Sequence, residues 1–210
     1  MMKPNAQFWD KLAVKYAAQP ISDPDAYEQT LERVVSYLKP TDRVLELGCG
    51  TGSTALKLAP HAGSILATDF SEGMIAQAEA RMGVDNVRFL QADTFSPALA
   101  DGSFEVVMGF NLFHLVDRVD EALARVHDLL APGGVFISKT PCLGERSLGL
   151  KFGLLKRFIP LMQLVGKATF VRFETIESLE ARIARAGFEI VETGNYPLRP
   201  PSHFVVARRS

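Results

Sequence analysis

The chain has 210 residues, of which 47% are hydrophobic and 22% charged, with a formal net charge of −1. That length suits one domain with a substantial core, and the balanced charge gives no general reason to expect a nucleic acid as partner. We expect no secretory signal, because the first 10 residues lack an apolar stretch, and no membrane span, because no run approaches ~18 apolar residues. Cys49 and Cys142 form no C-x-x-C pair, so we expect no metal site, two free thiols and a cytoplasmic protein.

Apolar periodicity and turn residues divide the chain into alternating helices and strands. The expected helices are 8–18, 26–38, 53–58, 72–82, 119–130 and 176–186, and the expected strands are 43–47, 64–68, 87–91, 104–110, 135–139, 188–192 and 204–207. This alternation predicts an α/β fold with a doubly wound, mostly parallel seven-stranded sheet.

The most informative segment is the run V-L-E-L-G-C-G-T-G at 44–52. An apolar strand that carries Glu46 runs into Gly48, Gly50 and Gly52, and a helix is expected to follow. A Cβ at these glycines would block either the tight turn or the approach of a ligand to the backbone. The spacing differs from the dinucleotide pattern G-x-G-x-x-G, because a serine stands where that pattern has its last glycine. No Lys-Ser or Lys-Thr pair follows, as a phosphate-binding loop would require.

This run resembles motif I of the class I S-adenosylmethionine-dependent methyltransferases, and the chain resembles their small-molecule, methyltransferase-11/25-like type. The resemblance covers 43–137 with high specificity, and 8–38 and 176–207 more loosely. It implies a Rossmann-like methyltransferase fold with S-adenosylmethionine as cofactor, held at the carboxyl ends of the strands. The A-P-G-G segment at 131–134 matches the family's turn into its fifth strand.

The resemblance assigns cofactor contacts to residues at these strand ends. Asp69 would accept hydrogen bonds from the ribose hydroxyls, although an acid there could also be a helix N-cap. Met74 would pack on the adenine ring or belong to the ordinary helix core. Asp93 would bind the adenine amino group or be a surface acid. The full set of expected cofactor-binding residues is Tyr16, Glu46, Gly48, Cys49, Gly50, Gly52, Asp69, Phe70, Met74, Ala92, Asp93, Phe110 and Asn111.

The segment 110–114 follows the fourth expected strand and carries the expected catalytic residues, Asn111 and His114. In similar enzymes the backbone here receives the amino group of the methionine portion, and the side chains face the transferred methyl. His114 is a candidate general base; otherwise it positions substrate or caps the next helix. The segment lacks the [DN]-P-P-[YFW] signature of enzymes that methylate nucleic acids and protein amines, which favours a small-molecule acceptor and no nucleic-acid partner.

Two helical regions are expected to cover the site within a single methyltransferase domain, 1–210. The segment 1–40 resembles the lid of small-molecule members, with Tyr16 as its best contact, although core packing could equally explain Phe8 and Trp9. The segment 141–173 interrupts the alternation and holds six basic residues against one acidic residue. We expect it to be a helical substrate cap, with 147–167 as a lipophilic pocket roof, a peripheral contact with anionic membrane, or simply a packed lid helix. The cofactor-binding core would be 43–140, and 174–210 would supply a C-terminal helix and strands.

The leading interpretation is methyl transfer by in-line displacement to a small, lipophilic or aromatic acceptor. One alternative is a regulatory or accessory protein that binds S-adenosylmethionine without catalysis. Another is an NAD-dependent oxidoreductase, which the glycine spacing disfavours. The sequence names neither the acceptor atom nor the oligomeric state, because oxygen, nitrogen, carbon and sulfur acceptors share this scaffold.

Overall fold

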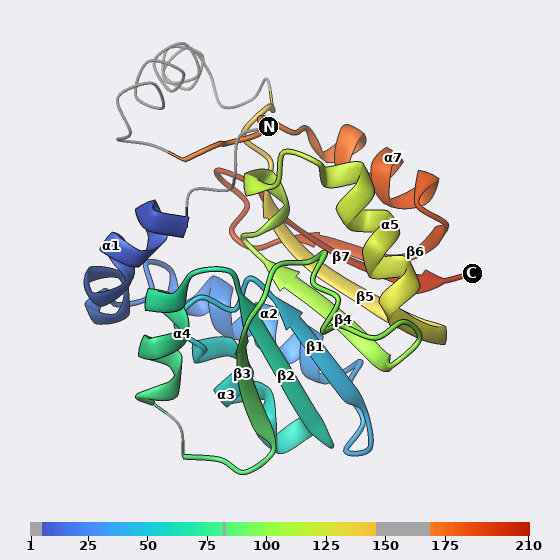
Figure 1. Cartoon of the computed structure of the whole chain (residues 1–210). Coiled ribbons are helices and arrows are strands. Elements are labelled where there is room, and N and C mark those ends of the chain that lie inside the picture. The colour runs from blue at the N-terminus through green and yellow to red at the C-terminus, as the bar shows by residue number, and fades with distance from the viewer. Residues whose placement is uncertain (1–5, 82, 146–168) are drawn as a thin grey trace.

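The computed structural model describes residues 6–81, 83–145 and 169–210 (Figure 1). The helices are α1 (Ala6–Ala18), α2 (Pro24–Val35), α3 (Ser53–Leu58), α4 (Glu72–Glu79), α5 (Val119–Leu129) and α7 (Ile176–Arg185), with 3₁₀ helices at Ala59–His61 and Phe113–Leu115. The strands are β1 (Arg43–Leu47), β2 (Ser64–Asp69), β3 (Val87–Gln91), β4 (Phe104–Phe110), β5 (Leu130–Pro141), β6 (Phe188–Asn195) and β7 (Ser202–Arg209).

The strands form one sheet of seven in the order β3-β2-β1-β4-β5-β7-β6. All neighbours are parallel except β7, which runs antiparallel to both β5 and β6. The predicted doubly wound, mostly parallel fold is therefore confirmed. The chain builds outward from β1 through β2 to β3 and then resumes on the other side of β1 with β4. Ligands in such sheets bind beyond the carboxyl ends of the strands at this switch point.

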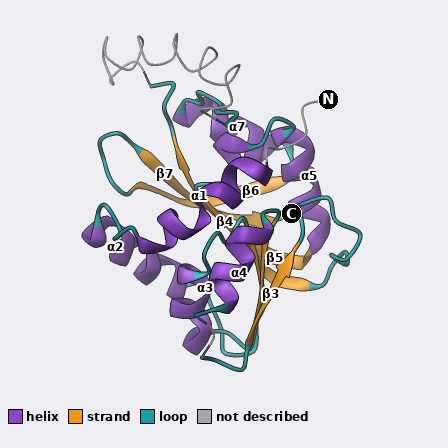
Figure 2. Cartoon of the chain, turned by 60° about the vertical axis from the view of Figure 1, so that its left-hand side comes forward, coloured by secondary structure: helices purple, strands orange, loops and turns teal. Residues whose placement is uncertain are grey.

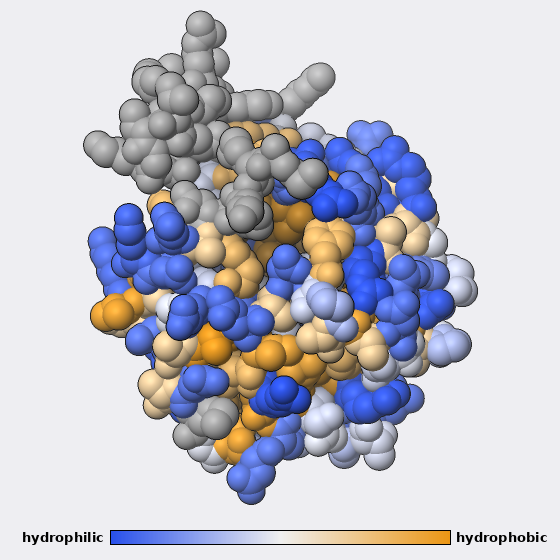
Figure 3. Space-filling model, in the orientation of Figure 1, coloured by the Kyte–Doolittle hydropathy of each residue, from blue (hydrophilic) through white to orange (hydrophobic). Residues whose placement is uncertain are grey.

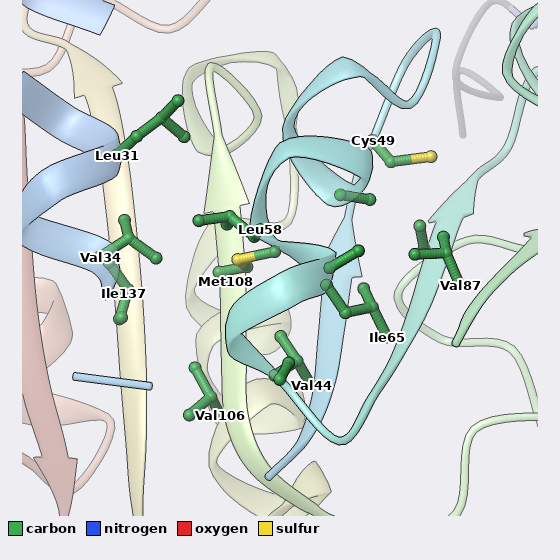
Figure 4. Close-up of a cluster of buried hydrophobic side chains, with 14 of the residues drawn as sticks. Leu31, Val34, Val44, Cys49, Leu58, Ile65, Val87, Val106, Met108 and Ile137 are labelled. Carbon is green, nitrogen blue, oxygen red and sulfur yellow. The ribbon is translucent and has the colours of Figure 1, made fainter. Parts of the chain in front are cut away.

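Helices cover both faces of the sheet, with α2, α3 and α4 on one side and α5 and α7 on the other (Figures 1 and 2). On the first face, Leu31 and Val34 of α2 lie over Ile137 of β5, and Leu58 of α3 lies over β4 (Figure 4). The opposite face has its own buried cluster, which includes Phe136 of β5. Burial on both faces explains why the central strands read as nearly continuous apolar runs.

The predicted turn at 131–134 lies inside β5, which is the main difference from the expected elements. Leu130 already pairs with Phe104, whereas Val135 pairs with Val106, so the intervening residues bulge out of the ladder. Gly133 takes a positive φ of 72° in this bulge, a conformation that suits glycine.

Several boundaries also differ from the expected ones. Helix α2 ends at Val35 and α4 at Glu79, earlier than expected, whereas β6 and β7 extend beyond their expected ends. The segment 147–167, with its predicted helical cap and membrane contact, lies outside the described residues. Within the described part of the chain, no helix is both long and apolar enough to cross a membrane.

Candidate active site

A cavity of about 820 Å³ opens at the carboxyl ends of the parallel strands. Its size is within the range of pockets that enclose small ligands. The space-filling view shows a hollow in the same face of the molecule, where apolar residues are visible between polar ones (Figure 3). The cavity walls include all but one of the expected cofactor residues: Tyr16, Glu46, Gly48, Cys49, Gly50, Asp69, Phe70, Met74, Ala92, Asp93, Phe110 and Asn111. The remaining one is Gly52.

The glycines of the loop after β1 have different reasons to lack a side chain. Gly52 has a φ of 75°, and a Cβ there would lie 2.6 Å from Cζ of Phe89, so this position is required for packing. Gly50 has a φ of 55°, but its Cβ would meet only Cε1 of Tyr16, at 3.9 Å. The backbone at Gly50 is therefore open to the cavity, as close approach of a ligand requires.

Asp69 ties this loop to the turn after β2. Its side chain is only 7% exposed, and it accepts hydrogen bonds from the Gly50 N–H at Oδ2 (3.0 Å) and the Ser71 N–H at Oδ1 (2.9 Å). Burial raises the pKa of Asp69, and these two N–H groups oppose the rise. The N-cap of α4 is Ser71, whose Oγ accepts from the Met74 N–H at 3.1 Å, so Asp69 does not take the alternative role of helix cap. Its oxygens retain further lone pairs for a ligand.

Glu46 is a second buried carboxyl in the cavity wall, 3% exposed. Its Oε2 atom has no hydrogen-bond partner among the described residues. Burial raises the pKa of Glu46 to about 8, and the nearby charge of Asp69 adds to the rise. A buried carboxyl oxygen without a hydrogen-bond partner destabilises the folded protein unless a ligand supplies that partner. The residues therefore fit S-adenosylmethionine, which carries a sulfonium and an ammonium group.

Helix α1 packs against α4 beside the cavity (Figure 2). Asp10 Oδ1 accepts hydrogen bonds from Ser71 Oγ (2.6 Å) and the Gly73 N–H (3.0 Å). The two helices approach so closely that a Cβ on Gly73 would lie 2.9 Å from Cα of Asp10. Arg81 of the turn after α4 donates to the Ala17 carbonyl at 2.5 Å and to Ser53 Oγ at 2.8 Å. These contacts hold Tyr16 over Gly50, where burial and then the charge of Asp69 raise the pKa of its hydroxyl.

The ends of β3 and β4 complete the wall around these residues. The Ala92 N–H donates to the Asp69 carbonyl at 3.0 Å, and Asp93 is exposed, with Oδ1 accepting from the Phe95 N–H at 2.9 Å. Asn111 has a positive φ of 54°, and its N–H donates to the Lys139 carbonyl at 2.8 Å. This unusual backbone conformation turns the chain sharply at the end of β4, beside β5.

His114, an expected catalytic residue, is like Gly52 absent from the cavity wall. It lies in the 3₁₀ helix after β4, and its Nδ1 atom has no partner among the described residues. Burial lowers the pKa of His114 to about 4. Its carbonyl accepts from the Arg172 N–H at 2.7 Å.

Lys139 is a cavity residue that no motif of the sequence indicates. It ends the V-F-I-S-K run of β5, is 9% exposed, and donates through Nζ to Thr30 Oγ1 of α2 at 3.1 Å. Burial lowers the pKa of Lys139, and the charge of Asp23 opposes that shift. One signal could have identified it, namely that Lys139 is the single charged residue in the buried stretch 135–140 of this strand.

No group of three or more His, Cys, Asp or Glu side chains that could hold a metal ion is found within the described residues. Both cysteines are free, as expected, and both are buried.

Comparison with known proteins gives the same family as the motifs. Residues 44–134 match the family described as "Methyltransferase domain". The chain is 30% identical over 183 residues to a malonyl-[acyl-carrier protein] O-methyltransferase of Geobacter sulfurreducens, covering 81% of this chain and 67% of that protein. It is 30% identical over 171 residues to a demethylmenaquinone methyltransferase of Thermus thermophilus, covering 72% of this chain and 76% of that protein.

A solved structure shows the same fold. An S-adenosylmethionine-dependent methyltransferase from Mesorhizobium loti superposes with a TM-score of 0.70 at 22% identity, over 88% of this chain and 98% of that one. The chain therefore belongs to the class I S-adenosylmethionine-dependent methyltransferases and is an enzyme that uses S-adenosylmethionine as its cofactor, as its motifs predict.

Proposed function

We propose that this enzyme methylates a small, lipophilic or aromatic acceptor by in-line displacement. The observation that carries the proposal is the composition of the cavity beyond the glycine loop. There the wall is largely apolar and is built from segments far apart in the chain, namely Ile21, Leu31, Phe110, Leu112, Leu115 and Phe170. An apolar wall with few polar groups is typical of small-molecule sites.

We propose that the predicted cofactor residues bind S-adenosylmethionine in the roles that the family resemblance implies. Asp69 would accept from the ribose hydroxyls, Met74 would pack on the adenine, and Ala92 and Asp93 would flank that ring. Their support is that they line one cavity with the glycine loop. Gly52 would act indirectly, by allowing the loop to pack on Phe89.

The chemistry requires little acid–base work from the protein. When bound, S-adenosylmethionine supplies a methyl group on a positively charged sulfur, which is a good leaving group. The protein's part is to position the acceptor and to exclude water. We propose that α1 excludes water from the cavity and that Asn111 is the polar residue facing the acceptor. For His114 we propose a supporting part, because its carbonyl holds Arg172, close to the cavity residue Phe170.

The acceptor itself does not follow from the relatives. One is named for malonyl-[acyl-carrier protein] and another for demethylmenaquinone, so relatives of equal identity carry names of different acceptors. We propose the cytoplasm as the compartment, supported by the two free thiols.

Methyl-labelled S-adenosylmethionine tests the proposal. We would incubate the enzyme with lipophilic phenols, quinols and small acids, and in parallel with RNA and protein. We expect label in an extracted small molecule, and little in the same reaction with Asp69→Ala. Label confined to RNA or protein would contradict a small-molecule acceptor. Cofactor binding without any labelled product would favour a non-catalytic protein.

A further inference from the structure

Lys139 is a buried cation whose charge no carboxylate of the described residues neutralises at ion-pair distance. Along β5, Val135 and Ile137 belong to the apolar cluster beneath α2, and Lys139 continues the same face because side chains alternate along a strand. A lysine in such a position is costly unless its ammonium is paired.

Thr30 is the one hydrogen-bond partner of the Lys139 ammonium among the described residues, and this single contact leaves two of the three ammonium donors unsatisfied. The Thr30 hydroxyl donates its own proton to the Ala26 carbonyl at 2.7 Å, and therefore receives Lys139 Nζ as an acceptor at 3.1 Å. An ammonium group has three donors, so donors remain for a further partner. The charge of Asp23 acts on the pKa of Lys139 without forming an ion pair with it, and Oδ1 of Asp23 accepts a hydrogen bond from the Ala26 N–H at 3.0 Å.

Lys139 lies on the β4–β5 side of the cavity. It pairs in register with Phe110, and its carbonyl accepts from Asn111, the residue proposed to face the acceptor. The acids Glu46 and Asp69 lie instead at the ends of β1 and β2, where the cofactor is expected. The other lysine or arginine of the described cavity wall is Arg81, which is bound to Ala17 and Ser53.

We propose that Lys139 receives an oxyanion of the methyl acceptor, either a carboxylate or an ionised hydroxyl. This inference rests on the proposed function and narrows its acceptor to an acidic molecule. An oxyanion would accept hydrogen bonds from the remaining N–H donors of Lys139. The apolar wall would hold the rest of the acceptor. Hydrogen bonds between charged partners are short and strong, so a single such contact would determine how the acceptor is oriented.

A purely structural role makes a different prediction. If Lys139 served only to hold α2 to β5 through Thr30, then Thr30→Val would have the same effect as removing the lysine. Anionic and neutral ligands would then bind both variants alike. If Lys139 binds the acceptor, Thr30→Val retains the ammonium and with it the selectivity for anions.

The test is calorimetric titration of the full chain, saturated with S-adenosylhomocysteine, against three probes. These are 2-naphthoate, its neutral isostere 2-naphthamide, and 4-nitrophenol at a pH where it is ionised. We expect one or both anions to bind wild type about tenfold or more tightly than the amide. Lys139→Met should abolish that preference and leave the Kd for S-adenosylhomocysteine unchanged. Lys57→Met, which removes an exposed lysine paired with Glu28, should keep the preference.

The two anionic probes also distinguish the sources of the oxyanion. Preference for naphthoate alone indicates a carboxylic acid acceptor, and preference for nitrophenolate alone indicates an ionised hydroxyl. Equal binding of acid and amide, a preference that persists in Lys139→Met, or no probe binding to an enzyme that binds S-adenosylhomocysteine would each overturn the inference. Failure to bind S-adenosylhomocysteine would instead overturn the proposed function and the inference with it. Should Lys139→Met not fold, Lys139→Gln serves in its place, because its amide can still donate to Thr30.

Discussion

Two buried carboxyl groups in the cavity wall, Asp69 and Glu46, differ in how their oxygens are satisfied. Both oxygens of Asp69 accept a backbone N–H, whereas Glu46 leaves Oε2 without a partner in the described structure. Burial raises the pKa of each. Asp69 can therefore act as a fixed hydrogen-bond acceptor that also shapes the glycine loop. Glu46 is the carboxyl that a cationic ligand would stabilise more, because one of its oxygens has no partner among the described residues.

Asp69→Ala should weaken cofactor binding. We expect a loss of about 1.5–3 kcal/mol in binding free energy, the usual contribution of hydrogen bonds to a charged group. Calorimetric titration with S-adenosylhomocysteine measures it, and Asp85→Ala, at an exposed acid outside the cavity, is the matched control. An affinity equal to that of wild type would refute the ribose assignment.

Glu46→Gln should change how stability depends on pH. The pKa of Glu46 is raised in the folded protein from 4.5 to about 8, so the folded state holds this proton more tightly than the unfolded state. Between these two values the free energy of unfolding of wild type should therefore fall with rising pH, relative to Glu46→Gln. Below the lower value and above the upper one, the difference between the two proteins should be constant.

Urea unfolding of both proteins across that pH range measures this difference. The variant itself corrects for all other titrating groups, since they are common to both chains. A difference that does not vary with pH would show that Glu46 titrates normally in the folded protein.

His114→Ala should leave turnover within a few-fold of wild type and cofactor affinity unchanged. His114 lies outside the described cavity wall, and its pKa of about 4 makes it a weak base. Steady-state kinetics with the acceptor found by label transfer would measure both quantities. A strong loss of turnover at unchanged cofactor affinity would instead establish His114 as the general base.

At the scale of elements, the docking of α1 on α4 decides whether the cavity has a lid. The contact depends on Gly73, because only a residue without a Cβ lets the backbone of α1 approach so closely. Asp10 then satisfies the Gly73 N–H in the first turn of α4, where a negative charge is favoured by the helix dipole.

Gly73→Ala should loosen α1 without unfolding the sheet. Its Cβ would lie 2.9 Å from Cα and 3.1 Å from the carbonyl oxygen of Asp10, so α1 must shift. We expect faster amide hydrogen exchange in α1 and weaker binding of S-adenosylhomocysteine, with exchange in β1 and β4 unchanged. Gly83→Ala is the control, because its Cβ would meet nothing within 4 Å. Unchanged exchange in α1 would mean that α1 is not held by this contact.

At the scale of the whole molecule, the mostly parallel sheet with helices between its strands follows from features that the sequence displays. Phe104–Phe110 is apolar except at Glu105 because both faces of β4 are covered, and such a run can be recognised from the sequence alone. The glycine loop and the acid that ends β2 can also be predicted from the sequence, since each comes at the end of an apolar strand. The β5 bulge could not be predicted, because A-P-G-G indicates a turn equally well between two elements or within one strand.

The unpredicted parts of the site are those that depend on contacts between distant segments. Lys139 gains its significance from Thr30, and Gly73 from Asp10, pairs that no local pattern connects. The 3₁₀ helix after β4 explains why His114 lies outside the wall that Asn111 and Leu112 help to form. Sequence patterns thus predict which strand ends meet, but not which side chain of a loop faces inward.

The most direct test of the whole assignment is calorimetric titration of the enzyme with S-adenosylmethionine, with NAD as the control ligand. Gly48 and Gly50 of the glycine loop, Glu46 and the buried Asp69 all line one cavity, and Oε2 of Glu46 has no hydrogen-bond partner among the described residues. Together they predict a site for the sulfonium cofactor. We predict saturable binding of S-adenosylmethionine and none of NAD. Binding of NAD without S-adenosylmethionine would contradict the assignment of this cavity as the cofactor site.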